Sequence, residues 1–256
     1  MTTAQRPSAD EPWTPAWARR PTSLPKAVTA ELVQRIVRGD YPPGSALPAE
    51  HALCDVFSVS RTVVREAVKV LQEKGLVQIR QGSGTAVLPS TSWNMLDELV
   101  LAATIEVDEA LGVLDDLVVT RRLLESDMAF VAARTAGPDD LDRMRELVDR
   151  MDELVGDPES YHEQDRAFHD TVMRASGNRI ARAVVRSLES QVVNTASYMG
   201  RTERSLCEAS NRGHRAVCER IAAGDPEGAA AAMSAHITDA WLVRRGEHGD
   251  PDRLAR

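Results

Sequence analysis

The chain has 256 residues, of which 43% are hydrophobic, and its formal net charge is −8. This length and apolar content allow two domains, each with its own core. No apolar run approaches the roughly 20 residues that cross a bilayer, and the N-terminus lacks the apolar core of a signal peptide, so we expect no membrane association. Three cysteines without a CxxC pair favour a protein of the reducing cytoplasm over a disulfide-stabilised secreted one.

The charge is distributed unevenly along the chain. Residues 24–88 hold eight Lys and Arg against six Asp and Glu, a balance of +2, whereas residues 89–256 hold 20 against 31, a balance of −11. Because phosphate repels an acidic surface, any contact with DNA would be confined to the first part. The asymmetry therefore predicts two domains with different roles.

The first elements are short helices. Residues 1–23 are rich in Pro, Arg and Thr, and we predict a disordered extension there. A helical pattern begins near Leu24 and stops at the glycines and prolines of residues 39–44. A second short helix is predicted to start at Pro48, a favourable first-turn residue. Its apolar residues, all expected to be buried, are Ala52, Leu53, Val56 and Phe57.

A third helix follows Ser60, whose hydroxyl can cap the first turn. Apolar residues recur at i, i+3, i+4 and i+7 and form one stripe: Val64, Ala67, Val68 and Leu71. The opposite side is basic and polar: Arg61, Thr62, Arg65, Lys69 and Gln72. The free N–H groups of such a helix start can face phosphates, and its arginines can reach guanine edges. An ordinary solvated face is the alternative interpretation of Arg61 and Arg65.

After Gly75 the hydrophobic period changes from 3.6 to 2. Residues 77–80 and 85–88 read as two strands, joined by the glycine-rich residues 81–84, which predicts a β-hairpin. The Gly82-Ser83-Gly84 tip lacks the GK[ST] and helix that follow in a phosphate-binding loop. A helix with a basic first turn and a small wing behind it suits insertion into a DNA groove.

These elements together resemble the winged helix-turn-helix of the GntR family of bacterial transcription regulators. The resemblance covers about 65 residues and is carried by Pro43-Gly44, Leu47-Pro48, Glu50, Val59-Ser60-Arg61, Arg65-Glu66-Ala67 and Gly82-Ser83-Gly84. It implies that double-stranded operator DNA is held by Ser60, Arg61, Thr62, Arg65 and the wing-tip Gly82. His51 stands where the FadR branch of the family commonly has a long polar side chain, so we assign it no DNA contact.

Residues 89–92 are predicted to be a linker, and from Trp93 onward every strong pattern is helical. Glycine-proline and similar pairs separate the helices, which are expected at about 95–104, 109–135, 138–155, 158–175, 178–199, 202–223 and 226–244. Residues 246–256 are predicted to be a polar tail.

Four polar residues lie on helix faces that should be buried. Asp165 and His169 are i, i+4 and point the same way, while His214 and His236 each interrupt an apolar stripe of a later helix. An unpaired buried carboxylate costs several kcal/mol, and three imidazoles with one carboxylate suit a divalent metal such as zinc or nickel. Each histidine alone could instead be a hydrogen-bonded core residue. Helical spacing does not show that the helices converge.

Residues 93–245 resemble the all-helical FCD ligand-binding domain of the FadR subfamily. Many of its members bind metal through an Asp-x-x-x-His pair and two later histidines, a pattern that Asp165, His169, His214 and His236 match. His162 is expected to be a surface or rim residue. Gly213 replaces the glutamate usual before the third ligand, which predicts a looser support of that ligand.

Arg121 lies on the predicted buried stripe of helix 109–135. It could pair internally with Glu125, at i+4, or it could bind the carboxylate of an effector through its planar fork. The resemblance favours the effector-binding role, because FCD domains often carry an arginine here and sense carboxylates. Residues 93–97 also resemble those of sugar-acid-responsive members.

These observations predict a mostly helical protein with a winged helix-turn-helix at 24–88 and an FCD bundle at 93–245. Its expected function is that of a cytoplasmic repressor, a homodimer whose operator binding responds to a divalent metal and a small carboxylate. A metal-dependent enzyme and a metal sensor, each using the same Asp/His cluster, are the alternatives. Neither HExxH nor an evident general base accompanies the cluster, which argues against the enzyme.

Overall fold

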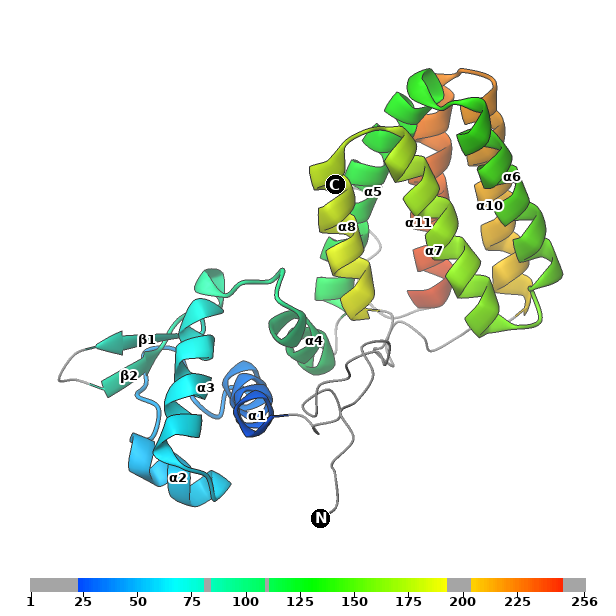
Figure 1. Ribbon diagram of the computed structural model, residues 1–256. Coiled ribbons are helices and arrows are strands. Elements are labelled where there is room, and N and C mark those ends of the chain that lie inside the picture. The colour runs from blue at the N-terminus through cyan, green and yellow to red at the C-terminus, as the bar shows by residue number, and fades with distance from the viewer. Residues whose placement is uncertain (1–22, 81–83, 109–110, 193–203, 246–256) are drawn as a thin grey trace, which may run out of the picture. The chain divides into compact units, whose positions relative to one another are not determined.

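A computed structural model describes residues 23–80, 84–108, 111–192 and 204–245, and the chain divides between Trp93 and Asn94 into two compact units (Figure 1). The predicted N-terminal extension up to residue 22, the wing-tip Gly82 and the tail 246–256 lie outside the described residues. Among the described helices, none combines the length and apolar character needed to cross a membrane.

The first unit contains three helices and a two-stranded antiparallel sheet: α1 (Leu24–Arg38), α2 (Glu50–Phe57), α3 (Arg61–Glu73), β1 (Val77–Arg80) and β2 (Gly84–Val87). Helix α2 begins at Glu50, not at the predicted Pro48. The preceding segment is extended because the Leu47 N–H donates to the Thr85 carbonyl at 2.8 Å, alongside a bridge between Ala46 and Ala86. Because residues 46 and 47 pair with β2 as an extended segment, the helix cannot start at Pro48 and begins two residues later.

Helix α3 has the predicted two faces. Its stripe of Val64, Ala67, Val68 and Leu71 is buried, and α3 packs against α1. The Ser60 hydroxyl accepts from the Val63 N–H at 3.4 Å, so the predicted cap is confirmed. In α2 only Leu53 is fully buried; Val56 was predicted to be buried but is 60% exposed. Helix α2 turns only one side toward the core, so Ala52 and Phe57 are half-buried and Val56 is exposed.

The predicted linker is packed onto the winged unit. Residues Ser90–Ser92 form a short 3-10 turn, η2, and the Trp93 indole N–H donates to the Leu88 carbonyl at 3.2 Å. Gly75, with φ of +75°, lies so close that an added Cβ would stand 2.1 Å from the Ser92 carbonyl oxygen. Glycine is therefore required there both for its positive φ and for this approach.

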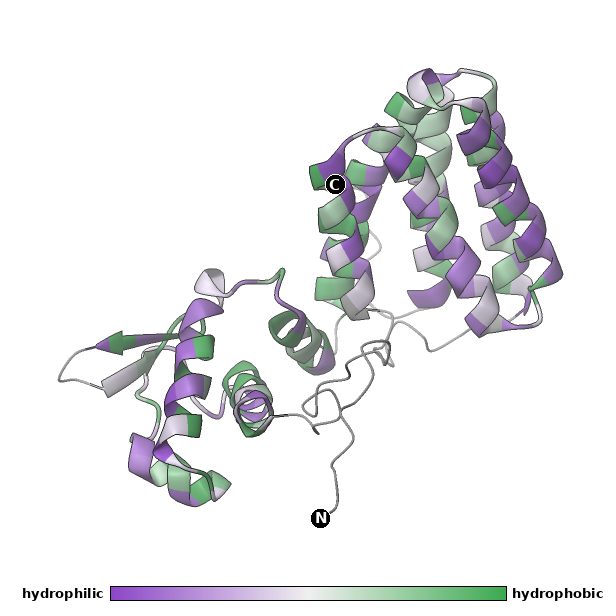
Figure 2. Cartoon of the chain, viewed as in Figure 1, coloured by the Kyte–Doolittle hydropathy of each residue, from purple (hydrophilic) through white to green (hydrophobic). Residues whose placement is uncertain are grey.

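The second unit consists of helices in its described part: α4 (Glu98–Val107), α5 (Gly112–Thr135), α6 (Pro138–Glu153), α7 (Pro158–Ala175), α8 (Arg179–Val192), α10 (Arg204–Ala222) and α11 (Pro226–Arg245). Helix α4 begins at Glu98, not near residue 95, because the Asp97 carboxylate accepts from the N–H groups of Leu99 and Val100. Figure 2 shows hydrophilic and hydrophobic residues interspersed along each helix, as expected of amphipathic helices around a shared core.

Helix α5 packs along α11, which in turn packs along α10. A buried polar contact fixes the packing of α5 against α11. Asp115 accepts from the Trp241 indole N–H and from the Arg245 guanidinium, both at 2.8 Å. Because both partners of Asp115 lie on α11, this contact sets how α11 lies on α5. It thereby also sets the position of His236, which α11 carries.

Candidate functional site

The predicted DNA-reading residues share the exposed start of α3. Ser60, Arg61, Thr62 and Arg65 are all exposed, and the Arg65 Nε lies 2.8 Å from a carboxylate oxygen of Glu50. Both side chains of this pair are largely exposed, so it contributes little to stability and can exchange for a contact with DNA. The start of α3 and its N-cap thus present two guanidinium groups and two hydroxyls on one surface.

Replacing Arg65 with alanine is expected to cost about 1–3 kcal/mol of specific DNA binding and to relax preference at one operator position, if the guanidinium reads a base edge. Fluorescence anisotropy with the operator and single-base variants measures both effects. Arg143→Ala, which removes an exposed arginine of α6 paired with Glu146, is the control. Unchanged affinity and sequence preference would remove Arg65 from the reading role.

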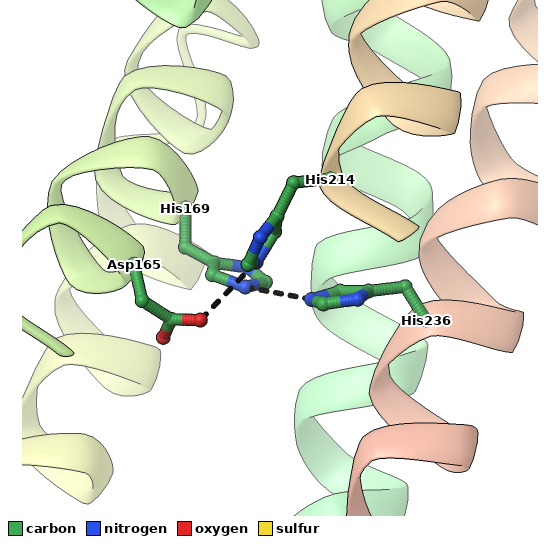
Figure 3. A group of neighbouring side chains, drawn as sticks. All are labelled: Asp165, His169, His214 and His236. Carbon is green, nitrogen blue, oxygen red and sulfur yellow. Dashed lines mark hydrogen bonds and ion pairs between the residues drawn. The ribbon is translucent and has the colours of Figure 1, made fainter. Parts of the chain in front are cut away.

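The four polar residues singled out in the helical unit come together. Asp165 and His169 project from α7, His214 from α10 and His236 from α11 (Figure 3). Four donor atoms, one from each, lie within 4.8 Å of one another. The Nε2 atoms of His169 and His236 are 3.2 Å apart, and His214 Nε2 is 3.2 Å from an Asp165 oxygen. His162, expected at the rim, is half-buried and outside this group.

This donor set fits a divalent metal ion. Ligands about 2.1 Å from a tetrahedral metal stand roughly 3.4 Å apart, close to the two distances of 3.2 Å. His214 is fully buried, yet among the described residues its Nε2 has no hydrogen-bond partner of acceptable geometry, although Asp165 is near. A buried nitrogen without a partner is costly. A metal at the centre of the group would satisfy it together with the other three donors.

Two further residues hold the histidines in place. Glu125 of α5 is fully buried, and one of its oxygens lies 2.6 Å from His169 Nδ1. Asn211 of α10 places its side-chain oxygen 3.4 Å from His214 Nδ1. Such partners fix the ring orientation of metal-binding histidines. From the sequence, Glu125 was predicted only as a possible partner of Arg121. Its position one helical turn after Arg121, on the side predicted to be buried, was the available signal.

For Glu125, Asp165 and His236, the surroundings favour the protonation states that a metal requires, whereas the Glu125 carboxylate outweighs burial and raises the pKa of His169. Burial raises the pKa of Glu125, but its arginine and histidine neighbours outweigh burial and hold it below the ordinary value. Burial also raises the pKa of Asp165, and the neighbouring His214 ring outweighs it, so this pKa lies well below the ordinary value. Burial, reinforced by the adjacent histidines, lowers the pKa of His236. Ionised carboxylates and a neutral imidazole are the forms that bind metal.

Replacing Glu125 with glutamine is expected to weaken zinc binding about 10–100-fold, because His169 loses the carboxylate that orients it. Competition with a chromogenic chelator measures the zinc affinity, and circular dichroism checks that the variant is folded. Glu163→Gln, at an exposed position of α7, is the matched control. An unchanged zinc affinity in folded Glu125→Gln would show that this carboxylate does not support the site.

Arg121 lies on the buried side of α5, as predicted, and makes the internal pair that was its alternative role. Its Nε is 2.7 Å from Glu125, and a terminal nitrogen is 2.8 Å from Glu189 of α8. Arg121 also lines a small pocket beside Asp165 and His236. The pocket volume is about 30 Å³, enough for roughly one water molecule but too small for an organic acid.

Comparison with known proteins identifies both units. The model for "Bacterial regulatory proteins, gntR family" matches residues 24–87, and the model for the "FCD domain" matches residues 116–239. The HTH-type transcriptional regulator LutR of Bacillus subtilis is 30% identical over 82% of this chain and 96% of its own length. The chain belongs to the GntR family. It is therefore a DNA-binding transcription regulator rather than an enzyme, and the predicted pairing of a winged helix-turn-helix with an FCD domain is confirmed.

Two other proteins place this GntR-family regulator among its relatives. The galactonate operon transcriptional repressor of Escherichia coli is 29% identical over 79% of this chain and 88% of that protein. A solved structure of Lar, described as controlling the Listeria monocytogenes agr system, has a TM-score of 0.59 and 20% identity, covering 88% of this chain and 98% of that one. At this identity the Lar structure supports the shared fold alone.

Proposed function

We propose that this regulator is a repressor whose FCD domain binds one divalent metal, zinc or nickel, and a small organic acid that modulates operator binding. The observation that carries the metal is the convergence of four donor atoms within 4.8 Å of one another, among them the buried Nε2 of His214, which lies 3.2 Å from an Asp165 oxygen. Three imidazoles and a carboxylate fill a four-coordinate shell, and a metal that expands to five or six ligands would also take water or an oxygen of a ligand.

The DNA-binding part of the proposal assigns operator contact to Ser60, Arg61, Thr62, Arg65 and Gly82. One winged helix offers few base contacts, so two copies on a near-palindromic site give the specificity a repressor needs. The acidic helical unit is the proposed dimerising part, because its charge keeps it off DNA. Binding to operator DNA also implies a cytoplasmic protein.

The acid part of the proposal rests on positive charge beside the metal cluster. Arg121 lines the inner pocket, although a direct contact with the acid would have to displace Glu189. The similarity to the galactonate operon repressor makes sugar acids such as D-galactonate the first compounds to test. We propose a small carboxylate as the class of effector.

A metal sensor is the second candidate, because the pocket beside the cluster has room for an ion and water but not for an acid. Operator affinity measured for metal-free protein, zinc-loaded protein and zinc-loaded protein with acids separates the two. We expect the acid, not zinc alone, to release DNA. Release by zinc alone would favour the sensor, and no response to either would contradict both candidates.

A further inference from the structure

Asn211 of α10 is a buried polar side chain next to the proposed metal site, and its orientation is fixed from α6. Its amide nitrogen donates to the Val148 carbonyl at 3.0 Å and to a carboxylate oxygen of Asp152 at 2.5 Å. A carbonyl and an ionised carboxylate accept hydrogen bonds and cannot donate them. The amide therefore cannot turn over, and its oxygen faces the remaining neighbour, His214, whose Nδ1 lies 3.4 Å away.

Asp152, the outer of the two acceptors, is itself held in place. Its second carboxylate oxygen lies 2.5 Å from a guanidinium nitrogen of Arg215. Both side chains of this ion pair are largely exposed, so the pair adds little to stability. Its effect is to keep the carboxylate ionised and turned toward Asn211, which is thus held from two points of α6.

Gly213, the residue directly before His214, cannot support that ring. A Cβ on Gly213 would stand 2.5 Å from His236 Nδ1, so a side chain there would displace the His236 imidazole. Glycine is unfavourable inside a helix, and here it makes room for the ring. Support for His214 then has to come from elsewhere, and Asn211, three residues before His214, reaches its Nδ1.

The two ring nitrogens of His214 face different groups, and a neutral imidazole carries its one proton on either of them. With the proton on Nδ1, the N–H donates to the Asn211 oxygen and the bare Nε2 faces the donor cluster. With the proton on Nε2, the N–H would face Asp165, whose oxygen is 3.2 Å away but outside good hydrogen-bond geometry (Figure 3). The bare Nδ1 would then oppose the Asn211 oxygen, acceptor against acceptor. Only the first tautomer offers Nε2 to a metal.

We propose that Asn211 is a positioning residue that holds His214 in the tautomer that binds metal, with the proton on Nδ1 and a bare Nε2. The proposal rests on the metal binding proposed above and adds what prepares this ligand before the metal arrives. The Glu125 carboxylate accepts in the same way from His169. For His214 the acceptor is a neutral amide, so the ring is oriented without further negative charge beside the site.

Long-range proton–nitrogen NMR of the metal-free full chain reads which ring nitrogen carries the proton. At about pH 8, above the ordinary histidine pKa of about 6.5, the ring is neutral, and the signals lost in His214→Gln identify it. We expect the wild-type proton on Nδ1. Asn211→Leu removes the acceptor and leaves Asp165 as the neighbour, so the proton should move to Nε2. Glu208→Leu, at an exposed position of α10, is the control and should leave it on Nδ1.

Zinc affinity, measured by competition with a chromogenic chelator, gives the effect on the site. It should fall about 10–100-fold in Asn211→Leu, because the ring must move its proton back to Nδ1 and leave that buried N–H without an acceptor. Glu208→Leu should bind zinc as the wild type does. Circular dichroism checks that both variants are folded. A side chain that served packing alone would not change which ring nitrogen is protonated.

The outcomes separate this proposal from the proposed function. A wild-type proton on Nε2 would overturn the role of Asn211, whether or not the leucine variant folds. An unchanged tautomer or an unchanged zinc affinity in folded Asn211→Leu would overturn it as well, and the metal site would stand without this support. If the wild type does not bind zinc, the proposed function fails at its metal, while the tautomer of the metal-free chain still decides whether Asn211 orients His214.

Discussion

Replacing His214 and His236 together with alanine is expected to abolish zinc binding, from about one ion per chain to none. The two substitutions remove two of the four converging donors. The remaining donors, Asp165 and His169 of α7, cannot complete a tetrahedral shell. Zinc at 1,000 times its Kd stabilises the folded state by about 4 kcal/mol. At roughly 2–4 °C per kcal/mol for a domain of this size, the wild type should melt about 10 °C higher with zinc than without it, and the double variant should show no such difference.

Elemental analysis of protein dialysed against zinc, with melting curves recorded by circular dichroism, measures both quantities. His162→Ala is the control, because His162 is half-buried on the same helix as His169 but outside the cluster. His214→Gln with His236→Gln keeps side-chain volume and separates metal loss from a packing defect. Full zinc content in either folded double variant would refute the site.

Saturating the zinc-loaded protein with its cognate acid is expected to weaken operator binding about 5–150-fold, the usual range of allosteric coupling. Linkage requires that operator DNA weaken acid binding by the same factor. The expected reason is that the proposed acid binds against helices that also carry the proposed metal ligands, so that a shift of these helices would change how the proposed dimer presents its two recognition helices. Because Ser92 packs against Gly75 of the winged unit, we expect the change to reach that unit through the segment that contains Ser92.

Anisotropy titrations of operator with and without acid give one factor, and calorimetric titrations of acid with and without operator give the other. The double-alanine variant of His214 and His236 is the control: its operator affinity should not respond to the acid. If the two measured factors differ, the two titrations do not report the same pair of coupled sites, which would reveal a further binding site. Equal affinities with and without acid would mean that the acid is not an effector.

Local sequence patterns determined the winged unit. The stripe from Val64 to Leu71, the Ser60 cap and the change of period after Gly75 are properties of neighbouring residues, and α3 and the hairpin follow them closely. Where the pattern misplaced an element, a contact from elsewhere competed. The residues before α2 pair with β2 through the bridge between Ala46 and Ala86, 40 positions apart in the chain, so α2 starts later than predicted. Local propensity sets an element, but a distant partner can move its ends.

Periodicity also determined that Asp165, His169, His214 and His236 turn toward the interior, because helical spacing fixes which face a residue occupies. It could not determine that they meet, since they lie on three helices whose mutual placement depends on packing. The resemblance to FCD domains supplied that expectation, and the tertiary structure supplied the distances.

Only the tertiary structure decided which groups surround the cluster. The i, i+4 spacing predicted that Glu125 could pair with Arg121. It could not predict the contact between Glu125 and His169, which lie 44 positions apart in the sequence. From the sequence, Gly213 was noted only as replacing a glutamate that is usual at this position. Its close approach to His236 is a contact between α10 and α11, which the sequence did not predict. The sequence by itself thus determined the two kinds of unit and the inward-facing polar residues, because these depend on spacing along one chain segment. The packing of separate helices decided the distances between the donor atoms, the pairing of Arg121 with Glu189 and the contacts that hold Asn211 against α6. No local spacing encodes that packing.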